Sequence, residues 1–309
     1  MKAMKLPSRI PFMAIRNVAF AITVVISLIG LGSLFKHGLN FGLDFTGGTL
    51  IELTYEKPAD LELIKRELGQ AGYADAVVQS FGSTTDVLVR LAGDSPDLGN
   101  QVAGALRNID TETSFEVKRV EFVGPQVGEE LRDQGGLAML LALGGILLYL
   151  AFRFQWKFGV GAIASLAHDV IVTLGILAFF QVPFDLTVMA AVLAMLGYSL
   201  NDTIIIYDRI RENFRMLRKA DIIENIDVSV TQTLLRTIAT STSTAMALVA
   251  LLVFGGDSLA GFALTLLIGV VVGTYSSVYI SAPVLIWLKL TSEDLIPPAA
   301  TAEGVDERP

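Results

Sequence analysis

The chain has 309 residues, 52% of them hydrophobic and only 17% charged, and its mean hydropathy is +0.59. A soluble domain carries about 25% charged residues. Here the apolar residues gather in blocks of about 18 or more, long enough to span a lipid bilayer. These features exclude a generic soluble enzyme. Because the chain has no cysteine, a disulfide framework and thiol or iron–sulfur chemistry are also excluded.

The first apolar block follows four basic residues, as the apolar core of a signal peptide would: Lys2, Lys5, Arg9 and Arg16. However, the block at 18–35 has 18 residues and lacks a small-x-small cleavage site followed by polar sequence. We therefore expect a retained first transmembrane helix, preceded by a cytoplasmic N-terminal segment at 1–17.

Six blocks are predicted to span a membrane: 18–35, 135–152, 158–180, 186–207, 237–254 and 259–288. The last is long enough to tilt or to kink near Pro283. Six spans place both termini on one side, and the positive-inside rule chooses which side. Basic clusters precede the first span and follow the second and the fourth, whereas the two short connections on the other side carry only Asp185 and Asp257. Both termini are therefore predicted to be cytoplasmic, with a cytoplasmic loop at 208–236 and a cytoplasmic tail at 289–309.

The segment 36–133 is extracytoplasmic in this topology. It carries nine Lys/Arg and 17 Asp/Glu residues, a balance of −8 that equals the formal charge of the whole chain. This acidity argues against nucleic acid as a partner. Apolar spacing predicts six elements in the order β-α-β-β-α-β: 49–55, 59–71, 77–81, 86–91, 98–109 and 115–123. The order predicts an α+β ferredoxin-like domain, a fold that by itself names no function.

Asp202 is the most informative ionisable residue, because it lies within the fourth span, roughly 9 Å of helix before Asp208 and the cytoplasmic polar zone. Arg236 stands at the cytoplasmic end of the fifth span, so antiparallel packing would bring both side chains to the same depth. Thr240 follows one turn later and continues a polar stripe toward Ser243 or Thr244.

Two interpretations of the Asp202–Arg236 pair remain open. Burial disfavours an ionised carboxylate, whereas a nearby guanidinium favours it, so Asp202 could bind and release a proton as its distance from Arg236 or its hydration changes. Such a site would couple a proton gradient to motion. Alternatively, the two residues form a static ion pair that fixes helix packing.

His168 and Asp169 lie near the middle of the third span. Adjacent residues point about 100° apart on a helix, so we expect that they do not both face one site. The only other histidine, His37, is in the extracytoplasmic segment, which argues against a metal site, and no cofactor is expected. A proton relay and a role in helix packing both remain open for this pair.

Two glycine motifs have structural interpretations. Gly269 and Gly273 form a GxxxG in the sixth span, which indicates close packing either with a helix partner or within the chain. The stretch DFTGGT at Asp44–Thr49 is no phosphate loop, because it lacks a following lysine and a helix start. Its glycines are expected to shape the entry from the first span into the extracytoplasmic domain.

Five strings occur in the order and with the spacing of a known family: GLDFTGGTLIEL (42–53), RVEFVGPQVG (119–128), LAHDVIVTLGIL (166–177), GYSLNDTIIIYDRIRENFR (197–215) and SVTQTLLRT (229–237). From about Phe41 to Trp287 the chain resembles the SecF branch of the SecD/SecF family of protein-export membrane proteins, within the resistance–nodulation–division superfamily.

The resemblance implies an accessory subunit of the bacterial Sec translocase in the inner membrane, paired with a separate, pseudo-symmetric SecD chain. The complex would use the proton-motive force to assist a polypeptide through the SecYEG channel after the SecA motor has acted, with YajC and YidC as further partners. The family's intramembrane aspartate and arginine fall on Asp202 and Arg236, with Thr240 on the same face. The candidate supporting residues are His168, Asp169, Tyr198 and Asn201.

Other functions remain to be weighed against this one. Half of a proton-coupled small-molecule or lipid exporter of the same superfamily would be expected to have more spans and larger exported regions. A purely structural scaffold would use Asp202 and Arg236 only for packing. An intramembrane protease is disfavoured, because the sequence has no serine–lysine, zinc-ligand or paired transmembrane-aspartate arrangement, and we expect no enzymatic activity.

Overall fold

The structure is a computed structural model that describes residues 9–291 and 294, apart from 81–82, 94, 96, 110–113, 218–219 and 292–293. The predicted terminal segments at 1–17 and 289–309 therefore lie partly outside the described residues. The described chain divides into two compact units. One is a helical unit and the other, formed by Asn40–Leu141 and Pro183–Met189, contains an α+β domain.

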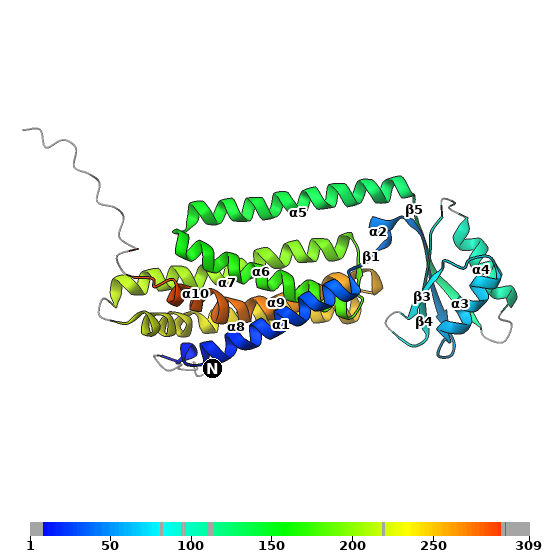
Figure 1. Cartoon of the computed structure of the whole chain (residues 1–309). Helices are drawn as coiled ribbons and strands as arrows, with labels where there is room; N and C mark the ends of the chain where they lie inside the picture. The colour runs from blue at the N-terminus through cyan, green and yellow to red at the C-terminus, as the bar shows by residue number, and fades with distance from the viewer. Residues whose placement is uncertain are drawn as a thin grey trace, which may run out of the picture. The chain divides into compact units, whose positions relative to one another are not determined.

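Six helical stretches are long and apolar enough to cross a membrane, which confirms the predicted class of multi-pass helical protein. Their elements are α1 (Arg16–His37, after η1 at Phe12–Ile15), α5 (Pro125–Arg153), α6 (Trp156–Phe179), α7 (Leu186–Met216), α8 (Ile222–Phe254), and α9 (Asp257–Ser276) continued by η2 (Ser277–Ser281) and α10 (Ala282–Trp287). In the helical unit α9 lies alongside both α6 and α8 (Figure 1).

The segment 208–236, which was predicted to be a cytoplasmic loop, is helical over most of its length. Helix α7 continues to Met216 and α8 already begins at Ile222. Charged residues in this region pair along the helix, as Arg209 does with Glu212 at i,i+3. Hydropathy marks only the apolar part of each helix, so the polar extensions escaped a prediction based on apolar length.

The sixth span is interrupted by the π-helical turn η2, which ends two residues before Pro283. Proline removes a backbone donor from a helix, and prolines and π-helical turns are both known causes of kinks in long helices. The Tyr207 hydroxyl of α7 donates to the carbonyl of Ser281 in this turn at 3.1 Å. A Cβ on Gly161 of α6 would lie 2.2 Å from that hydroxyl oxygen, so glycine there leaves room for the bond.

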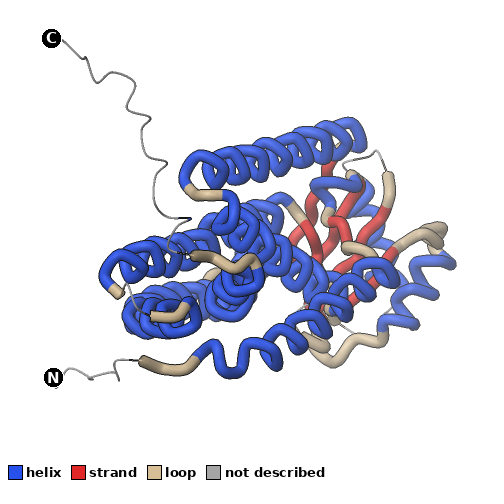
Figure 2. The backbone as a smooth tube through the Cα atoms, turned by 60° about the vertical axis from the view of Figure 1, so that its left-hand side comes forward, coloured by secondary structure: helices blue, strands red, loops and turns tan. Residues whose placement is uncertain are grey.

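The α+β domain has the predicted element order: β2 (Gly48–Tyr55), α3 (Leu61–Gln70), β3 (Val77–Ser80), β4 (Asp86–Leu91), α4 (Leu98–Ile109) and β5 (Phe115–Val123). Its four strands, red in Figure 2, form an antiparallel sheet in the order β3-β4-β2-β5. This arrangement is compatible with a ferredoxin-like fold.

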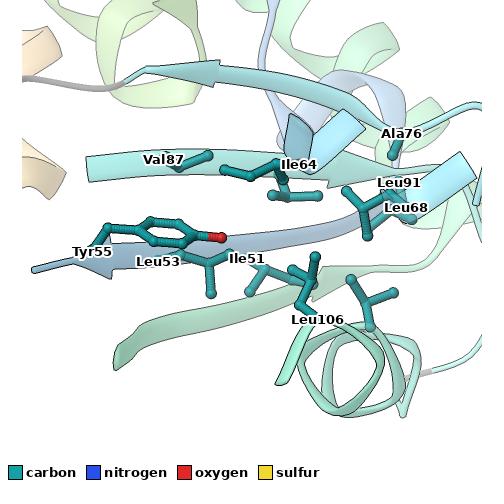
Figure 3. Packing of buried hydrophobic residues seen from close by; sticks show 11 residues of the cluster. Ile51, Leu53, Tyr55, Ile64, Leu68, Ala76, Val87, Leu91 and Leu106 are labelled. Atoms are coloured by element: carbon teal, nitrogen blue, oxygen red, sulfur yellow. The ribbon is translucent and has the colours of Figure 1, made fainter. Parts of the chain in front are cut away.

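The core of the α+β domain lies between the sheet and its two helices (Figure 3). Alternate residues of β2 point to the same face, so Ile51, Leu53 and Tyr55 are all buried there. The i, i+4 spacing of Ile64 and Leu68 on α3 places both side chains in the same core. Hydrophobic periodicity therefore explains why the boundaries of these elements could be predicted closely.

Candidate functional site

The antiparallel helices α7 and α8 are held in register by polar side chains on both sides of the candidate site. At one end the Tyr198 hydroxyl lies 3.4 Å from Oγ of Ser241. At the other end Nδ2 of Asn213 donates to Oγ of Ser229 at 2.8 Å. The positions between these two contacts place the middle of α7 opposite the first apolar turns of α8.

Asp202 lies in this bracketed stretch of α7 and is buried, with only 1% of its surface exposed. Within the described residues, neither of its carboxylate oxygens has a hydrogen-bond partner. Buried polar atoms are nearly always hydrogen-bonded, and an exception calls for a specific explanation. An ionised carboxylate in such a place is costly, so the site favours a group that can change its charge.

Arg236 of α8 lies close enough to interact electrostatically with Asp202. The two side chains nevertheless form no ion pair within 4.0 Å among the described residues. The Arg236 side chain is exposed on the surface of this chain. Asp202 is therefore a buried carboxylate within electrostatic range of a guanidinium that is exposed on the surface of the chain.

The remaining candidates on α7 and α8 have different surroundings. The Thr240 hydroxyl donates to the carbonyl oxygens of Arg236 and Thr237 at 3.1 and 3.0 Å, so it is satisfied by its own helix. Asn201 is exposed, although it directly precedes the buried Asp202. Tyr198 contributes to the contact between the two helices rather than to the carboxylate.

Asp169 of α6 is the centre of a buried polar network. Its Oδ2 accepts hydrogen bonds from the Ser199 hydroxyl of α7 at 2.5 Å and from the Ser276 hydroxyl of α9 at 2.8 Å. Ser165 in turn donates to Ser276 at 2.9 Å, and Nδ1 of His168 lies 2.9 Å from Oδ1 of Asp169. The network connects three helices. Both carboxylate oxygens of Asp169 have partners, whereas those of Asp202 have none among the described residues.

Adjacent helical residues were expected not to face one site squarely, but the side chains of His168 and Asp169 contact each other directly. The carboxylate of Asp169 reaches sideways to its neighbour, which a comparison of helical directions alone does not consider. Ser199 and Ser276 were not proposed as site residues. Their only signal in the sequence is a hydroxyl within an apolar span, a common feature that names no partner.

The GxxxG motif packs against α7 of the same chain. A Cβ on Gly269 would lie 2.2 Å from Cγ of Met195, and a Cβ on Gly273 would lie 2.8 Å from Cβ of Ser199. Of the two interpretations left open by the sequence, the intramolecular contact accounts for both glycines. The motif allows α9 to approach the face of α7 that carries Ser199, the α7 residue that bonds Asp169.

A second charged contact fixes the N-terminal end of α8. Asp227, only 1% exposed, pairs with the Arg9 guanidinium at 3.0 Å and accepts a hydrogen bond from the backbone nitrogen of Met13 at 2.9 Å. The Thr231 hydroxyl oxygen accepts from the nitrogen of Ile10 at 2.9 Å. The segment before α1 therefore clamps α8 about two and a half turns before Arg236.

Comparison with known families gives two matches on this chain. Residues 101–291 match the model of the protein export membrane protein SecD/SecF, C-terminal region, and residues 32–59 match the SecD/SecF GG motif. The chain is 67% identical over 300 residues to the protein translocase subunit SecF of Pseudomonas aeruginosa, covering 97% of this chain and 98% of the relative. It is 43% identical over 293 residues to the SecF subunit of Escherichia coli O157:H7, covering 94% and 91%.

Two solved structures are also similar. The crystal structure of SecDF, a translocon-associated membrane protein from Thermus thermophilus, matches 93% of this chain at 38% identity with a TM-score of 0.83. A structure of SecDF in a super-membrane-facing form matches 94% at 37% identity with a TM-score of 0.68. The match covers 40% of each SecDF chain, so the present chain corresponds to one part of those longer proteins.

Proposed function

Because the chain belongs to the SecD/SecF family of protein-export membrane proteins, we propose that it works with a SecD partner as a subunit of a bacterial protein translocase. In this proposal the two chains use the proton-motive force to assist polypeptides across the cytoplasmic membrane. The relatives named as translocase subunits match almost the whole chain. That match favours this function over a small-molecule or lipid exporter of the same superfamily.

The proposal of proton coupling rests on one observation, the buried Asp202 carboxylate with no hydrogen-bond partner among the described residues. An ionisable group at such a depth is a functional candidate by default, because it is expensive to keep there. Proton binding removes the charge and with it most of the cost of burial. Proton release restores the attraction to Arg236, which lies within electrostatic range.

The cycle follows from these two states of Asp202. With the carboxylate ionised, attraction to the guanidinium of Arg236 draws α7 and α8 together at this level. With the carboxylic acid neutral, that attraction is lost and the two helices are free to shift. Alternating protonation from the two sides of the membrane would then drive a repeated movement, which the extracytoplasmic domain would convert into movement relative to its counterpart on SecD. The chain does this work without catalysing a chemical reaction.

The exposed side chain of Arg236 supports a second subunit. A guanidinium at a depth where the bilayer would surround the chain needs a partner or water, and none of the described acidic residues is paired with it. We propose that the face of α8 carrying Arg236 and Thr240 packs against SecD. The SecYEG channel, the SecA motor, YajC and YidC are further proposed partners, and the translocating polypeptide is the substrate.

We also propose the inner membrane as the location, with both termini in the cytoplasm and residues 36–133 in the periplasm. The support for this orientation is the excess of lysine and arginine in the N-terminal segment and in the connections after the second and fourth spans. Reporter fusions after Gly38 and after Arg215 would test it, since the two fusions should report opposite sides.

The decisive experiment compares Asp202→Asn with wild type in proteoliposomes that hold the complete translocase. Asparagine keeps the size of the side chain but cannot carry a titratable proton. We expect normal assembly with SecD and loss of the gradient-dependent part of export. Full gradient-dependent export by the assembled variant would overturn the proposal.

Asp208→Asn provides a matched control on the same helix. Asp208 already has a partner, the Arg153 guanidinium at 2.8 Å, and its side chain is 43% exposed. Its substitution should therefore leave most of the gradient-dependent export in place. A complementary variant exchanges Asp202 and Arg236 with each other: a structural scaffold should tolerate the exchange, whereas a proton-binding site should not.

A further inference from the structure

The segment 44–49, which contains the two adjacent glycines, is hydrogen-bonded to the beginning of α7. Oδ2 of Asp44, in the short helix α2 (Leu43–Thr46), accepts a hydrogen bond from the backbone nitrogen of Leu186 at 3.0 Å. Leu186 is the first residue of α7, and helix N-termini have free backbone N–H groups that need acceptors. A residue 142 positions away along the chain therefore caps the helix that carries Asp202.

A second carboxylate caps the same helix end without joining it to the glycine segment. Oδ1 of Asp185 accepts from the nitrogen of Val188 at 2.8 Å and from the hydroxyl of Thr187 at 2.7 Å. Asp185 precedes α7 directly, so its contacts are local. The two caps differ in what they connect, since only the Asp44 bond crosses from one segment of the chain to another.

The backbone around Asp44 strengthens this connection. The strand β1 (Asn40–Phe41) pairs in parallel with β6 (Pro183–Phe184), and the nitrogen of Gly42 donates to the carbonyl of Phe184 at 2.8 Å. A Cβ on Gly42 would lie 2.9 Å from Cβ of Asp185. The close approach of these two backbones places the Asp44 side chain within reach of Leu186.

The adjacent glycines join the same segment to the sheet and to α5. Gly47 and Gly48 have φ angles of +65° and +109°, where a side chain would be strained. A Cβ on Gly48 would lie 2.3 Å from the carbonyl oxygen of Leu91 in β4, and one on Gly47 would lie 3.0 Å from Cα of Pro125, the first residue of α5. Gly48 begins β2 itself. The α+β domain, the start of α5 and the start of α7 therefore meet around one short segment.

We propose that Asp44 is a positioning residue that couples the α+β domain to α7, so that movement of α7 is passed to the domain. The inference rests on the proposed function, because it assumes that α7 moves when Asp202 gains or loses a proton. Asp202 lies 16 residues after Leu186 on the same helix, roughly 24 Å along its axis. A rigid helix with its first turn fixed to the domain transmits a displacement over that length.

The test measures gradient-dependent export by the complete translocase with three variants. In Asp44→Ala the bond to Leu186 is lost, and because replacing a cap by alanine typically shifts an equilibrium about fivefold, we expect a loss of coupling of that order. Asp44→Asn keeps an acceptor oxygen at the same position and should retain most of the coupling. Asp185→Ala removes a carboxylate from the same helix end but leaves the connection intact, so it should retain coupling as well.

A second measurement reports the connection without a gradient. Because the chain has no cysteine of its own, spin labels can be attached uniquely to the exposed positions Lys65 on α3 and Ala190 on α7. The distance distribution between the labels should widen in Asp44→Ala and stay as in wild type in Asp44→Asn and Asp185→Ala. The label distances can be measured even if Asp44→Ala exports poorly because it assembles poorly. Asp44→Glu gives a second variant, which keeps the negative charge but lengthens the side chain. It should widen the distance distribution in the same way.

The two proposals fail in different ways. An unchanged distance distribution and wild-type coupling in Asp44→Ala would overturn the role of Asp44, as would equal loss in the alanine and asparagine variants. Full gradient-dependent export by Asp202→Asn would instead overturn proton coupling, while the label measurement would still decide whether Asp44 holds the domain to α7.

Discussion

The Ser199 hydroxyl on α7 donates a 2.5 Å hydrogen bond to Oδ2 of Asp169 on α6, and neither residue is more than 1% exposed. Ser199 lies three residues before Asp202, so the two side chains are neighbours along one face of α7. One helix therefore presents a hydroxyl bonded to a carboxylate whose two oxygens both have partners and, one turn later, a carboxylate that has no hydrogen-bond partner among the described residues. This difference separates a structural acid from the proposed functional acid.

Removing the partnered carboxylate should destabilise the chain. In Asp169→Ala the hydroxyls of Ser199 and Ser276 each lose an acceptor on another helix, and interhelical hydrogen bonds in membranes contribute about 0.6 and at most about 1.7 kcal/mol each. We expect a loss of roughly 1–3 kcal/mol in the free energy of unfolding, measured by equilibrium unfolding in mixed micelles. Asp202→Asn breaks no hydrogen bond that the described residues make, so it should change stability much less. Equal destabilisation by the two variants would contradict the distinction between the acids.

A methyl group at Gly269 should force α9 away from α7. The added Cβ of Gly269→Ala would lie 2.2 Å from Cγ of Met195, a fully buried side chain. Overpacking of this kind typically costs about 1–3 kcal/mol, visible as a lower thermal transition of the purified chain. Gly144→Ala on α5 is the matched control, because apart from its chain neighbours and the nearby backbone of its own helix no described atom lies within 4 Å of the added Cβ. That variant should be neutral or slightly more stable, as alanine is the better helix former.

Acid should weaken the α+β domain at its β2–β4 pair. The Thr54 hydroxyl donates to Oδ1 of Asp86 at 2.6 Å and Ser83 donates to Oδ2 at 2.8 Å, with Lys118 at 3.2 Å. These contacts, the Thr54 bond first, lower the pKa of Asp86 below its ordinary value of 3.8. A lowered pKa in the folded state stabilises the fold above the unfolded value, and this contribution is lost as the pH falls through the lower, folded value.

Hydrogen exchange of the β2 and β4 amides in the full chain tests this expectation, after correction for the intrinsic pH dependence of exchange. Protection should be constant above the ordinary aspartate value and should fall below it. Thr54→Val removes the largest contribution, so the folded pKa of Asp86 moves back toward 3.8. The loss of protection below the ordinary aspartate value should then be smaller than in wild type and should end at a higher pH. An equally large loss that ends at the same pH in both proteins would show that the Thr54 bond does not set the pKa of Asp86.

The sequence alone was enough to predict the number of candidate spans and the order of strands and helices between the first and second span. Both depend on local patterns: the length of an apolar block and the period of apolar residues, as in Ile51, Leu53 and Tyr55 on β2. The depth of Asp202 also follows from its position within one apolar block. The polar extensions of α7 and α8 were missed because hydropathy reports apolar length and not helical length.

Only the tertiary structure decided which polar groups have partners. Whether a carboxylate is satisfied depends on side chains that arrive from other helices, such as Ser276 of α9 at Asp169, and no local pattern encodes that meeting. The same holds for Asp44 and Leu186, which are 142 residues apart in the chain and 3.0 Å apart in space. Local periodicity determined what the elements are. Long-range packing determined that Asp169 is hydrogen-bonded by other helices, that Asp202 has no such partner among the described residues, and that Asp44 bonds the start of α7.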